Sequence, residues 1–554
     1  MANPSVLISG AGPSGLILAL VLLQNGVSVR IIDKETKHRG GSRGSGIQAR
    51  TLELYDILGV LPDIFKAGDY ISPLAMYQPG KLEPDKISSL AEHLEPTPDT
   101  PHPNGWNLSQ DIHEEILRAH LQTYSCSVEL GSELRSFEQF PDHVVAHIVK
   151  TDAEGNQSEE RTRFDWLVGT DGAHSVVRKH LGLSFLGESR KEEYLCLGDI
   201  AVEEGIDPSF WHIWHVPPRL LALRSQGPKS NVFMFGYTGM SEKWLNRNMT
   251  REEFIEEFYD CTGRRDVKFG PATWLSTYRP NMRMVDNMRV GRVFVAGDAA
   301  HCHSPTGGQG LNSSVQDVAN LGWKLALVHK GLASPSLLDT YSEERLRVIA
   351  QMLKLTTDLF NKNFGSLKDR EIEEGAWERG GDLRMLGVNY CGSSIVQEED
   401  EVKEKVDNAY SKSASTSVQA AYRAPDASAL VRSGGDATPT TFFTLFSTAV
   451  HTILIFGADE ATRAQILEVL AGFPKETVRA VQVLPQGQSS QGQTADILVL
   501  EDREGHAYKG YGLPADQPTI VVVRPDGVVG TVVPAVEGVK RYFQKIFLEV
   551  RYGA

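Results

Sequence analysis

The strongest constraint on the fold is a strand, turn and helix pattern close to the start of the chain. Val6–Ser9 is a short apolar run, which is typical of a buried parallel strand. It is followed by Gly10, Gly12 and Gly15, spaced as G-x-G-x-x-G, and by an apolar stretch over residues 16–24 that predicts a helix. Because strand, glycines and helix occur in this order, the segment predicts a Rossmann-type βαβ unit that binds a dinucleotide.

Each residue type in this unit has a physical reason. Gly10 permits a tight turn, Gly12 lets backbone approach a pyrophosphate, and Gly15 lets the helix pack closely on the strand. A second strand over residues 27–32 leads to Asp33, whose carboxylate is placed to bind a ribose hydroxyl. An ordinary strand–helix turn with packing glycines is the competing interpretation. A membrane span is not expected, because the apolar stretch is too short.

Composition and charge exclude several other classes of protein. The 554 residues predict two to four domains, and 41% hydrophobic with 23% charged residues is ordinary for a soluble protein. A net charge of −15 without a long basic run argues against a nucleic acid partner. The five cysteines are scattered and form no C-x-x-C, so neither a disulfide framework nor a structural zinc is suggested. No targeting signal or bilayer-length apolar run is found, so a cytoplasmic location without a membrane partner is expected.

A second glycine-rich segment occurs in the middle of the chain. An apolar run over residues 292–296 predicts a buried strand that leads into Gly297 and Asp298, then T-G-G-Q-G and a helical stretch over residues 311–330. A carboxylate such as Asp298 accepts hydrogen bonds from sugar hydroxyls at adaptable angles. Glycines let backbone N–H groups approach a ligand, and the helix directs the positive end of its dipole there. A helix N-cap or a turn residue is the competing interpretation of Asp298.

Together the two segments resemble the FAD site of the class A aromatic hydroxylases, the family of p-hydroxybenzoate hydroxylase and phenol 2-monooxygenase. R-T-L-E-L-Y-D-I-L-G over residues 50–59 and the Asp171-Gly172 pair match further motifs of that family. The resemblance implies that FAD is bound by Gly10, Gly12, Pro13, Ser14, Gly15, Asp33, Lys34, Arg43, Gln48, Gln110, Asp171, Gly297, Asp298, Pro305, Gly308, Gly310, Leu311 and Asn312. Arg178, near the Asp171-Gly172 pair, is equally well explained by a surface position or a salt bridge. Cys302 and His303 lack suitably spaced partners, so no metal is expected.

The resemblance covers nearly the whole chain and implies an α/β fold in three parts. These are a Rossmann-type FAD-binding domain, a substrate domain built on an antiparallel sheet, and a C-terminal thioredoxin-like domain. The expected FAD-binding domain comprises residues 1–75, 105–185 and 286–395, the substrate domain residues 76–104 and 186–285, a linker residues 396–421, and the thioredoxin-like domain residues 422–554. The last part has no cysteine, so dithiol chemistry is excluded there and a stabilising or homodimer-forming module is the better interpretation.

The function implied by the resemblance is a FAD-dependent monooxygenase. Such an enzyme uses NADPH and O2 to hydroxylate a phenolic ring through a flavin C4a-hydroperoxide. The preference for NADPH over NADH follows from the resemblance alone. A phenol reacts faster when its hydroxyl is deprotonated, so a base or a proton relay is expected beside the ring.

The sequence leaves the identity of that base open. The phenol hydroxylase branch has an acidic residue where this chain has Ser45, and a serine alone is a poor base. Histidine and tyrosine can accept or relay a proton, and arginine can stabilise an anion, so the candidates are drawn from the expected antiparallel sheet. They are His212, His215, Arg224 and Tyr237. The competing interpretation is that each is an ordinary sheet or surface residue.

Four other functions compete with a phenol hydroxylase. A flavin-dependent halogenase is disfavoured because Trp211 and Trp214 are spaced as W-x-x-W instead of W-x-W. A flavin epoxidase or ring-modifying oxygenase shares the same motifs, and only its products would distinguish it. A non-catalytic FAD-binding protein is disfavoured because both flavin motifs are complete. A plain nicotinamide dehydrogenase would have no use for the second motif.

Overall fold

The computed structural model describes residues 4–189, 194–227, 230–239, 247–364, 379–397, 408–413, 415–434, 438–457, 459–488 and 496–548. The charged run over residues 398–407, which belongs to the expected linker, lies outside these residues. Among the described helices, none combines the length and the apolar character that a bilayer crossing requires.

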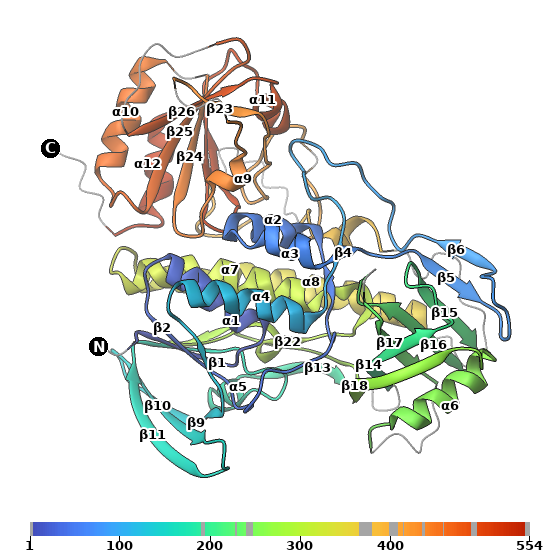
Figure 1. The fold of residues 1–554 in the computed structure, drawn as a ribbon. Helices are drawn as coiled ribbons and strands as arrows, with labels where there is room; N and C mark the ends of the chain where they lie inside the picture. The colour runs from blue at the N-terminus through green and yellow to red at the C-terminus, as the bar shows by residue number, and fades with distance from the viewer. Residues whose placement is uncertain are drawn as a thin grey trace.

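The N-terminal βαβ unit is the centre of a six-stranded sheet. Its order is β20-β21-β12-β1-β2-β8, parallel except for the pairing of β20 with β21. Helix α1 packs against α4 and α7 on one face of this sheet (Figure 1). The elements are β1 (Val6–Ser9), α1 (Pro13–Gln24), β2 (Val29–Ile32), α4 (Gln110–Thr123), β8 (Val128–Glu129), β12 (Trp166–Gly169), β20 (Arg289–Val290), β21 (Val293–Val295) and α7 (Gly310–His329).

Helix α1 begins at Pro13, three residues before the apolar stretch that predicted it. Gly12 is extended at the N-cap, and Pro13 occupies the first helical turn, where the missing N–H costs nothing. All residues from Gly15 to Leu22 are buried, so the helix is apolar on every side. The unit is therefore enclosed by protein, as a central βαβ unit of an α/β sheet must be.

Smaller elements surround this sheet. A three-stranded antiparallel layer, β9 to β11, follows α4 and is drawn at the lower left of Figure 1. A second small sheet places β22 next to β19, and a third joins β3, β7 and β4. The bounds are β3 (Gly46–Ile47), α2 (Ala49–Leu58), α3 (Leu61–Ala67), β4 (Asp69–Tyr70), β7 (Trp106–Asn107), β9 (Ser132–Gln139), β10 (Val144–Thr151), β11 (Gln157–Phe164), α5 (Val176–His180), β13 (Phe185–Ser189), β19 (Asn281–Val285), β22 (His301–Cys302) and α8 (Asp339–Phe364).

A seven-stranded sheet forms the second body, at the lower right of Figure 1. Its order is β18-β14-β17-β16-β15-β5-β6, and it is antiparallel except where β15 pairs in parallel with β5. The parallel pair arises because β5 enters from a distant part of the chain, with Leu74 opposite Trp211. The elements are β5 (Leu74–Tyr77), β6 (Lys86–Ser88), β14 (Leu195–Glu204), β15 (Trp211–Val216), β16 (Arg219–Ser225), β17 (Val232–Thr238), α6 (Arg251–Thr262) and β18 (Lys268–Tyr278).

The C-terminal part forms a separate mixed sheet of order β23-β26-β25-β24-β27-β28. The apolar run over residues 518–533 is two strands that turn back at Gly527, whose φ of +68° suits a glycine. The sheet lies at the top of Figure 1, where α9 packs against α2. Its elements are β23 (Leu430–Arg432), α9 (Phe442–Leu445), β24 (His451–Phe456), α10 (Glu460–Ala471), β25 (Val478–Leu484), β26 (Ile497–Asp502), α11 (His506–Tyr511), β27 (Thr519–Val523), β28 (Val529–Val533) and α12 (Val536–Gln544).

Candidate active site

The turn between β1 and α1 leaves space above one of its glycines. A Cβ atom added to Gly12 would meet nothing within 4 Å, whereas one added to Gly15 would lie 2.0 Å from the carbonyl oxygen of Gly10. Gly10 itself has a φ of +108°. Gly15 is therefore required for close packing of the helix, and Gly12 leaves its backbone open to a ligand.

A hollow of about 60 Å³ lies beside this open turn. Gly12, Asp33, Arg43 and Gln110 are among the residues that line it. One oxygen of Asp33 accepts a hydrogen bond from Ala11 N at 2.9 Å, which ties the end of β2 to the glycine turn. The structure thus brings together four residues that the sequence predicted to bind FAD, although 98 positions separate Gly12 from Gln110.

The second predicted motif follows β21. Gly297 has a φ of +59°, and its N–H donates to the buried carboxylate of Asp317 at 3.1 Å. The Asp317 carboxylate also accepts hydrogen bonds from His301 Nε2 at 2.7 Å and Arg345 Nε at 2.8 Å. Asp317 lies on helix α7 and therefore anchors the Gly297 turn to that helix. Sequence reasoning missed Asp317 and Arg345. Asp317 had one signal, a charge in a mostly uncharged helical stretch, whereas Arg345 lies in a charged run that gave no local signal.

Asp298 has the properties of a ligand for hydroxyl groups. Its side chain is exposed, and none of the residues that the structure describes donates a hydrogen bond to its carboxylate. The surrounding protein atoms nevertheless desolvate it and raise its pKa. A desolvated carboxylate without protein donors is suited to accept hydrogen bonds from the hydroxyls of a bound chain such as the ribityl group of FAD.

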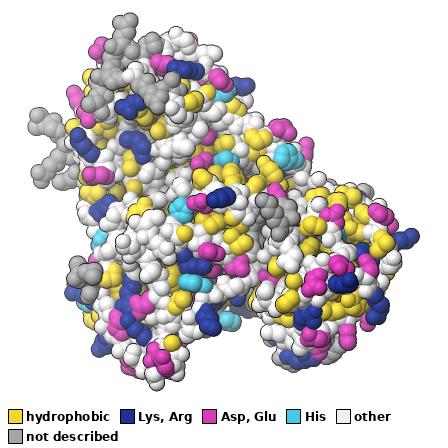
Figure 2. Space-filling model, viewed as in Figure 1, with side chains coloured by type: hydrophobic (Ala, Val, Ile, Leu, Met, Phe, Trp, Pro, Cys, Tyr) yellow, Lys and Arg dark blue, Asp and Glu magenta, His cyan; other side chains and the backbone are white. Residues whose placement is uncertain are grey.

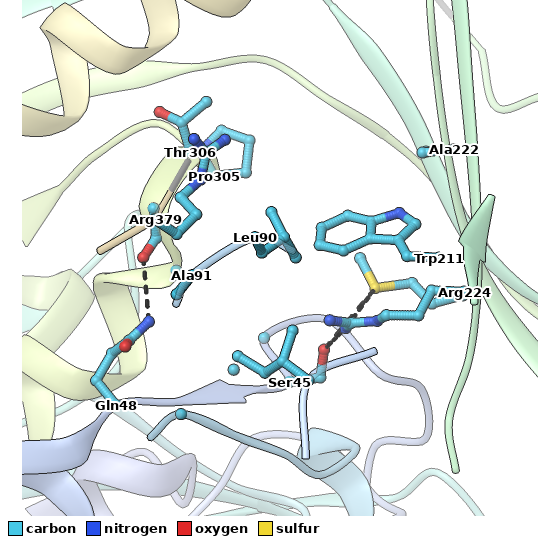
Figure 3. Close-up of a pocket in the computed structure, with 18 of the residues that line it drawn as sticks. Ser45, Gln48, Leu90, Ala91, Trp211, Ala222, Arg224, Pro305, Thr306 and Arg379 are labelled. Atoms are coloured by element: carbon cyan, nitrogen blue, oxygen red, sulfur yellow. Dashed lines mark hydrogen bonds between the residues drawn. The ribbon is translucent and has the colours of Figure 1, made fainter. Parts of the chain in front are cut away.

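Asn312, near the start of α7, holds two walls of the site together. Its Oδ1 accepts from Gln48 N at 2.7 Å, and its Nδ2 donates to Gly46 O at 2.8 Å and Gly308 O at 2.6 Å. Gln48 Nε2 also donates to Gly307 O at 3.4 Å, as Figure 3 shows. The glycine turn at residues 306–308 and the Ser45–Gln48 segment are therefore fixed to each other by predicted FAD-binding residues.

A larger cavity of about 420 Å³ opens onto this glycine turn. Pro305 and Thr306 lie on one side of it and Trp211 and Arg224 on the other, with Ser45 on a third wall (Figure 3). The size is that of a site for a small organic molecule. Its lining is mostly apolar, with contributions from Leu90, Leu195, Leu197, Leu220, Ala222 and Met234.

The strand alternation decides which candidate side chains reach this cavity. On β16, Leu220, Ala222 and Arg224 line the cavity, whereas Leu221 and Leu223 belong to the core between the sheet and α6. Neighbouring residues of a strand point to opposite faces, so a one-residue difference separates a cavity residue from a core residue. Of the four predicted catalytic residues, Arg224 is the one whose side chain this alternation directs into the cavity.

The other three candidates lie elsewhere. His212 stacks against Trp214, and its ring nitrogens lie 3.0 Å from the Tyr77 hydroxyl and 2.6 Å from the Asp207 carbonyl oxygen. Tyr237 borders the cavity, but its ring is in the core and its hydroxyl donates to Glu257 Oε2 at 2.7 Å. His215 is not among the residues that line the cavity. His212 and His215 therefore do not line the cavity, and the hydroxyl of Tyr237 is held by Glu257, so the proton transfer predicted for these three residues stays a prediction.

The remaining predicted FAD-binding residues have varied positions. Asp171 caps α5, because one carboxylate oxygen accepts from Val176 N and Val177 N. Arg178 is buried, donating to the carbonyl oxygens of Ala299 and Ala173, so it is neither a surface residue nor part of an ion pair within the described chain. Lys34 is exposed. Ser14 packs near Gly297, and Pro13, Gly310 and Leu311 lie at the N-terminal ends of α1 and α7.

Comparison with known proteins identifies families that match two parts of the chain. Residues 3–356 match the FAD binding domain family, and residues 494–551 match the phenol hydroxylase C-terminal dimerisation domain. A flavin-dependent monooxygenase of Mycobacteroides abscessus is 34% identical over 512 residues, which cover 90% of this chain and 98% of that protein. Pentachlorophenol 4-monooxygenase of Sphingobium chlorophenolicum is 32% identical over 70% of this chain and 71% of its own.

The fold has close counterparts among solved structures. Aklavinone-11 hydroxylase, solved as a ternary complex with FAD and aklavinone, superimposes with a TM-score of 0.77 at 25% identity, covering 98% of this chain and 99% of that one. The open glycine turn fits the same cofactor, and so does the Asp298 carboxylate, which accepts no hydrogen bond from the described residues. The chain therefore belongs to the FAD-binding family of flavin-dependent aromatic monooxygenases, and FAD is its cofactor.

Proposed function

We propose that this protein hydroxylates a phenolic ring with NADPH as reductant and O2 as oxidant. One observation carries the proposal: a single cavity is bordered by the glycine turn at Pro305–Gly308 and by the substrate-facing side of the seven-stranded sheet. An aromatic molecule in that cavity would lie beside a flavin ring held at the turn. The names of the relatives support an aromatic substrate, pentachlorophenol in one and aklavinone in another.

The residues of the site would bind and position the reactants, and the redox chemistry belongs to the cofactor. When bound, FAD carries electrons from the nicotinamide and activates oxygen. Gly12, Asp33 and Asp298 would hold the phosphates and sugar hydroxyls, and Asn312 keeps the two walls of the ring site in place. The apolar lining excludes water from the reacting ring. Helix α7 directs the positive end of its dipole toward the same turn.

The test is oxygen-dependent nicotinamide oxidation by the purified yellow protein. Consumption of NADPH and of NADH is followed with and without a panel of phenols and phenolic acids, together with hydrogen peroxide release. An accelerated rate that yields a product heavier by one oxygen atom supports the proposal. Accelerated oxidation that ends entirely in peroxide, or no response to any phenol, contradicts it. A product with an epoxide or a cleaved ring would identify the related ring-modifying oxygenases instead.

Two further features are proposed, each from a separate observation. The match to a phenol hydroxylase dimerisation domain supports a homodimer formed through the C-terminal part, which light scattering after size-exclusion chromatography would detect. None of the five cysteines forms a disulfide in the described structure, and four of them are buried, which supports a reducing, cytoplasmic location. Fractionation of the native cells would test that location.

A further inference from the structure

Basic side chains outnumber acidic ones around the large cavity, although the chain as a whole is acidic. Arg43, Arg224, Arg379 and Arg384 line it, and Glu92 is the one carboxylate among the lining residues. The chain as a whole has a net charge of −15. On the face drawn in Figure 2, acidic and basic side chains are interspersed, so the arginine excess is a local property of the cavity.

Arg224 is one of the two buried arginines among these four. It extends from β16, is 7% exposed, and lies over the ring of Trp211 with 4.8 Å between the guanidinium carbon and the ring centroid. Its Nη2 donates to Ser45 Oγ and lies 3.8 Å from Met234 Sδ. Figure 3 shows this contact at the bottom of the cavity. Both partners are neutral.

No carboxylate among the described residues forms an ion pair with Arg224. The acidic residue whose charge acts on Arg224 is Asp199. Its carboxylate accepts a hydrogen bond from Ser42 N at 2.6 Å instead of pairing with the guanidinium. Burial lowers the pKa of Arg224 to about 10, and Asp199 offsets this only in part. A guanidinium has five N–H donors, so donors that do not reach Ser45 remain available to a molecule in the cavity.

A buried charge without a counter-ion is unfavourable, and arginine is well suited to pair with carboxylates and other planar anionic groups. We propose that the aromatic substrate of this protein carries an anionic oxygen group, a carboxylate or an ionised phenol, that pairs with Arg224. This inference rests on the proposed function and defines its substrate class. A neutral ring of the same shape would leave the guanidinium uncompensated and would bind less tightly.

Ser45 has a specific part in this selectivity. A carboxylate at position 45 would contact Arg224, neutralise it, and repel an anionic ligand. A serine hydroxyl orients the guanidinium by one hydrogen bond and leaves its charge available. Replacing Ser45 with aspartate should therefore remove the preference for an anion while keeping Arg224 in place.

The experiment compares matched ligands that differ mainly in charge. The FAD-loaded protein is titrated at about pH 7.5, where a benzoate-type carboxyl is ionised, and the change in flavin absorbance gives the Kd. The carboxylate pair is 1-hydroxy-2-naphthoate and 1-hydroxy-2-naphthamide. The phenolate pair is 2,4-dinitrophenol and 2,4-dinitroanisole. The variants are Arg224→Met, Arg224→Lys, Ser45→Asp and, as a control, Arg264→Met, a buried arginine outside the cavity that is paired with Asp266.

In at least one pair, the wild type should bind the anionic member about tenfold or more tightly than the neutral member. The pair that shows this preference identifies the anionic group. Arg224→Met and Ser45→Asp should abolish that preference, Arg224→Lys should keep part of it, and the control should keep all of it. Equal binding in both pairs by the wild type, or a preference that survives Arg224→Met, would overturn the inference. If Arg224→Met does not fold, Ser45→Asp decides. Because binding is measured without turnover, a protein that prefers anions but oxidises no NADPH would contradict the proposed function alone.

Discussion

Arg524 and Glu344 form a fully buried ion pair between the C-terminal sheet and the flavin-binding helices. Arg524 follows β27, and its Nη1 lies 2.7 Å from Oε1 of Glu344 on α8, with neither side chain exposed. Oε2 of Glu344 also forms an ion pair with Nζ of Lys324 on α7, at 2.7 Å. The pKa of Glu344 is held well below its usual range by these two cations. The C-terminal part is thus joined by charge to the helix that begins at the flavin turn.

Replacing Glu344 with glutamine should strongly destabilise the protein. The change leaves Lys324 buried without its ion-pair partner and Arg524 with Asp526 as its remaining counter-ion. Breaking a buried ion pair typically costs about 3–5 kcal/mol. Chemical denaturation should show a markedly lower midpoint. Glu343→Gln is the matched control, since Glu343 is exposed and contacts only Ser394 in the described structure. Equal midpoints for the two variants would show that the network contributes little.

The two glycines of the first turn should respond differently to alanine. Gly12→Ala places a methyl group in open space, so the apoprotein should unfold at the wild-type midpoint while FAD binds much more weakly. Gly15→Ala forces a Cβ to within 2.0 Å of Gly10 O, so folding itself should suffer. Thermal denaturation of the apoproteins and FAD titration separate the two effects. A wild-type FAD affinity in Gly12→Ala would contradict the assigned path of the pyrophosphate.

Asp298→Ala should greatly reduce the FAD content of the purified protein. Hydrogen bonds to a charged group contribute about 1.5–3 kcal/mol each, so loss of the carboxylate should weaken the binding of FAD by roughly tenfold or more. The flavin-to-protein absorbance ratio and a fluorescence titration measure this. Asp286→Ala, a change at an exposed aspartate before β20, should retain full flavin. Unchanged flavin in Asp298→Ala would remove Asp298 from the site.

Tyr237→Phe and His212→Asn should leave the pH dependence of substrate-stimulated NADPH oxidation unchanged. The Tyr237 hydroxyl donates to Glu257, and the ring nitrogens of His212 contact Tyr77 and Asp207. These three partners lie outside the cavity lining. A proton acceptor must lie within hydrogen-bond reach of the substrate. If either variant shifts a limb of the pH–rate profile, the predicted proton-transfer role of that residue is restored.

His113 should make the folded protein less stable in acid. It is buried on α4 with its Nε2 2.8 Å from the Tyr55 hydroxyl, and burial lowers its pKa to about 3. Below about pH 6.5 the unfolded chain binds a proton that the folded chain does not, so stability falls as the pH falls from about 6.5 to about 3. Between pH 6.5 and 5 this contributes a loss of about 2 kcal/mol. His113→Gln should show a smaller loss in urea denaturation, whereas His120→Gln on the same helix should behave as the wild type.

The parts of the fold with local signals were predictable from the sequence. The β1–α1 turn, the strand before Gly297 and the long helix α7 occur where apolar periodicity and glycine spacing place them. Helix ends shifted by a few residues, because caps such as Gly12 and Pro13 set them. The parallel pairing of β5 with β15 had no local signal, since it joins segments more than 130 residues apart.

The sequence by itself determined which residues make the flavin turns, because glycine spacing, strand and helix are all encoded within a few neighbouring positions. Only the tertiary structure decided which side chains share the cavity. Arg224 meets Ser45 across 179 positions of the chain, whereas His212 and Tyr237 face the core on the opposite side of the same sheet. Strand register and packing determine which side chains face the cavity. A register shift of one residue would exchange the cavity-facing and core-facing side chains of a strand.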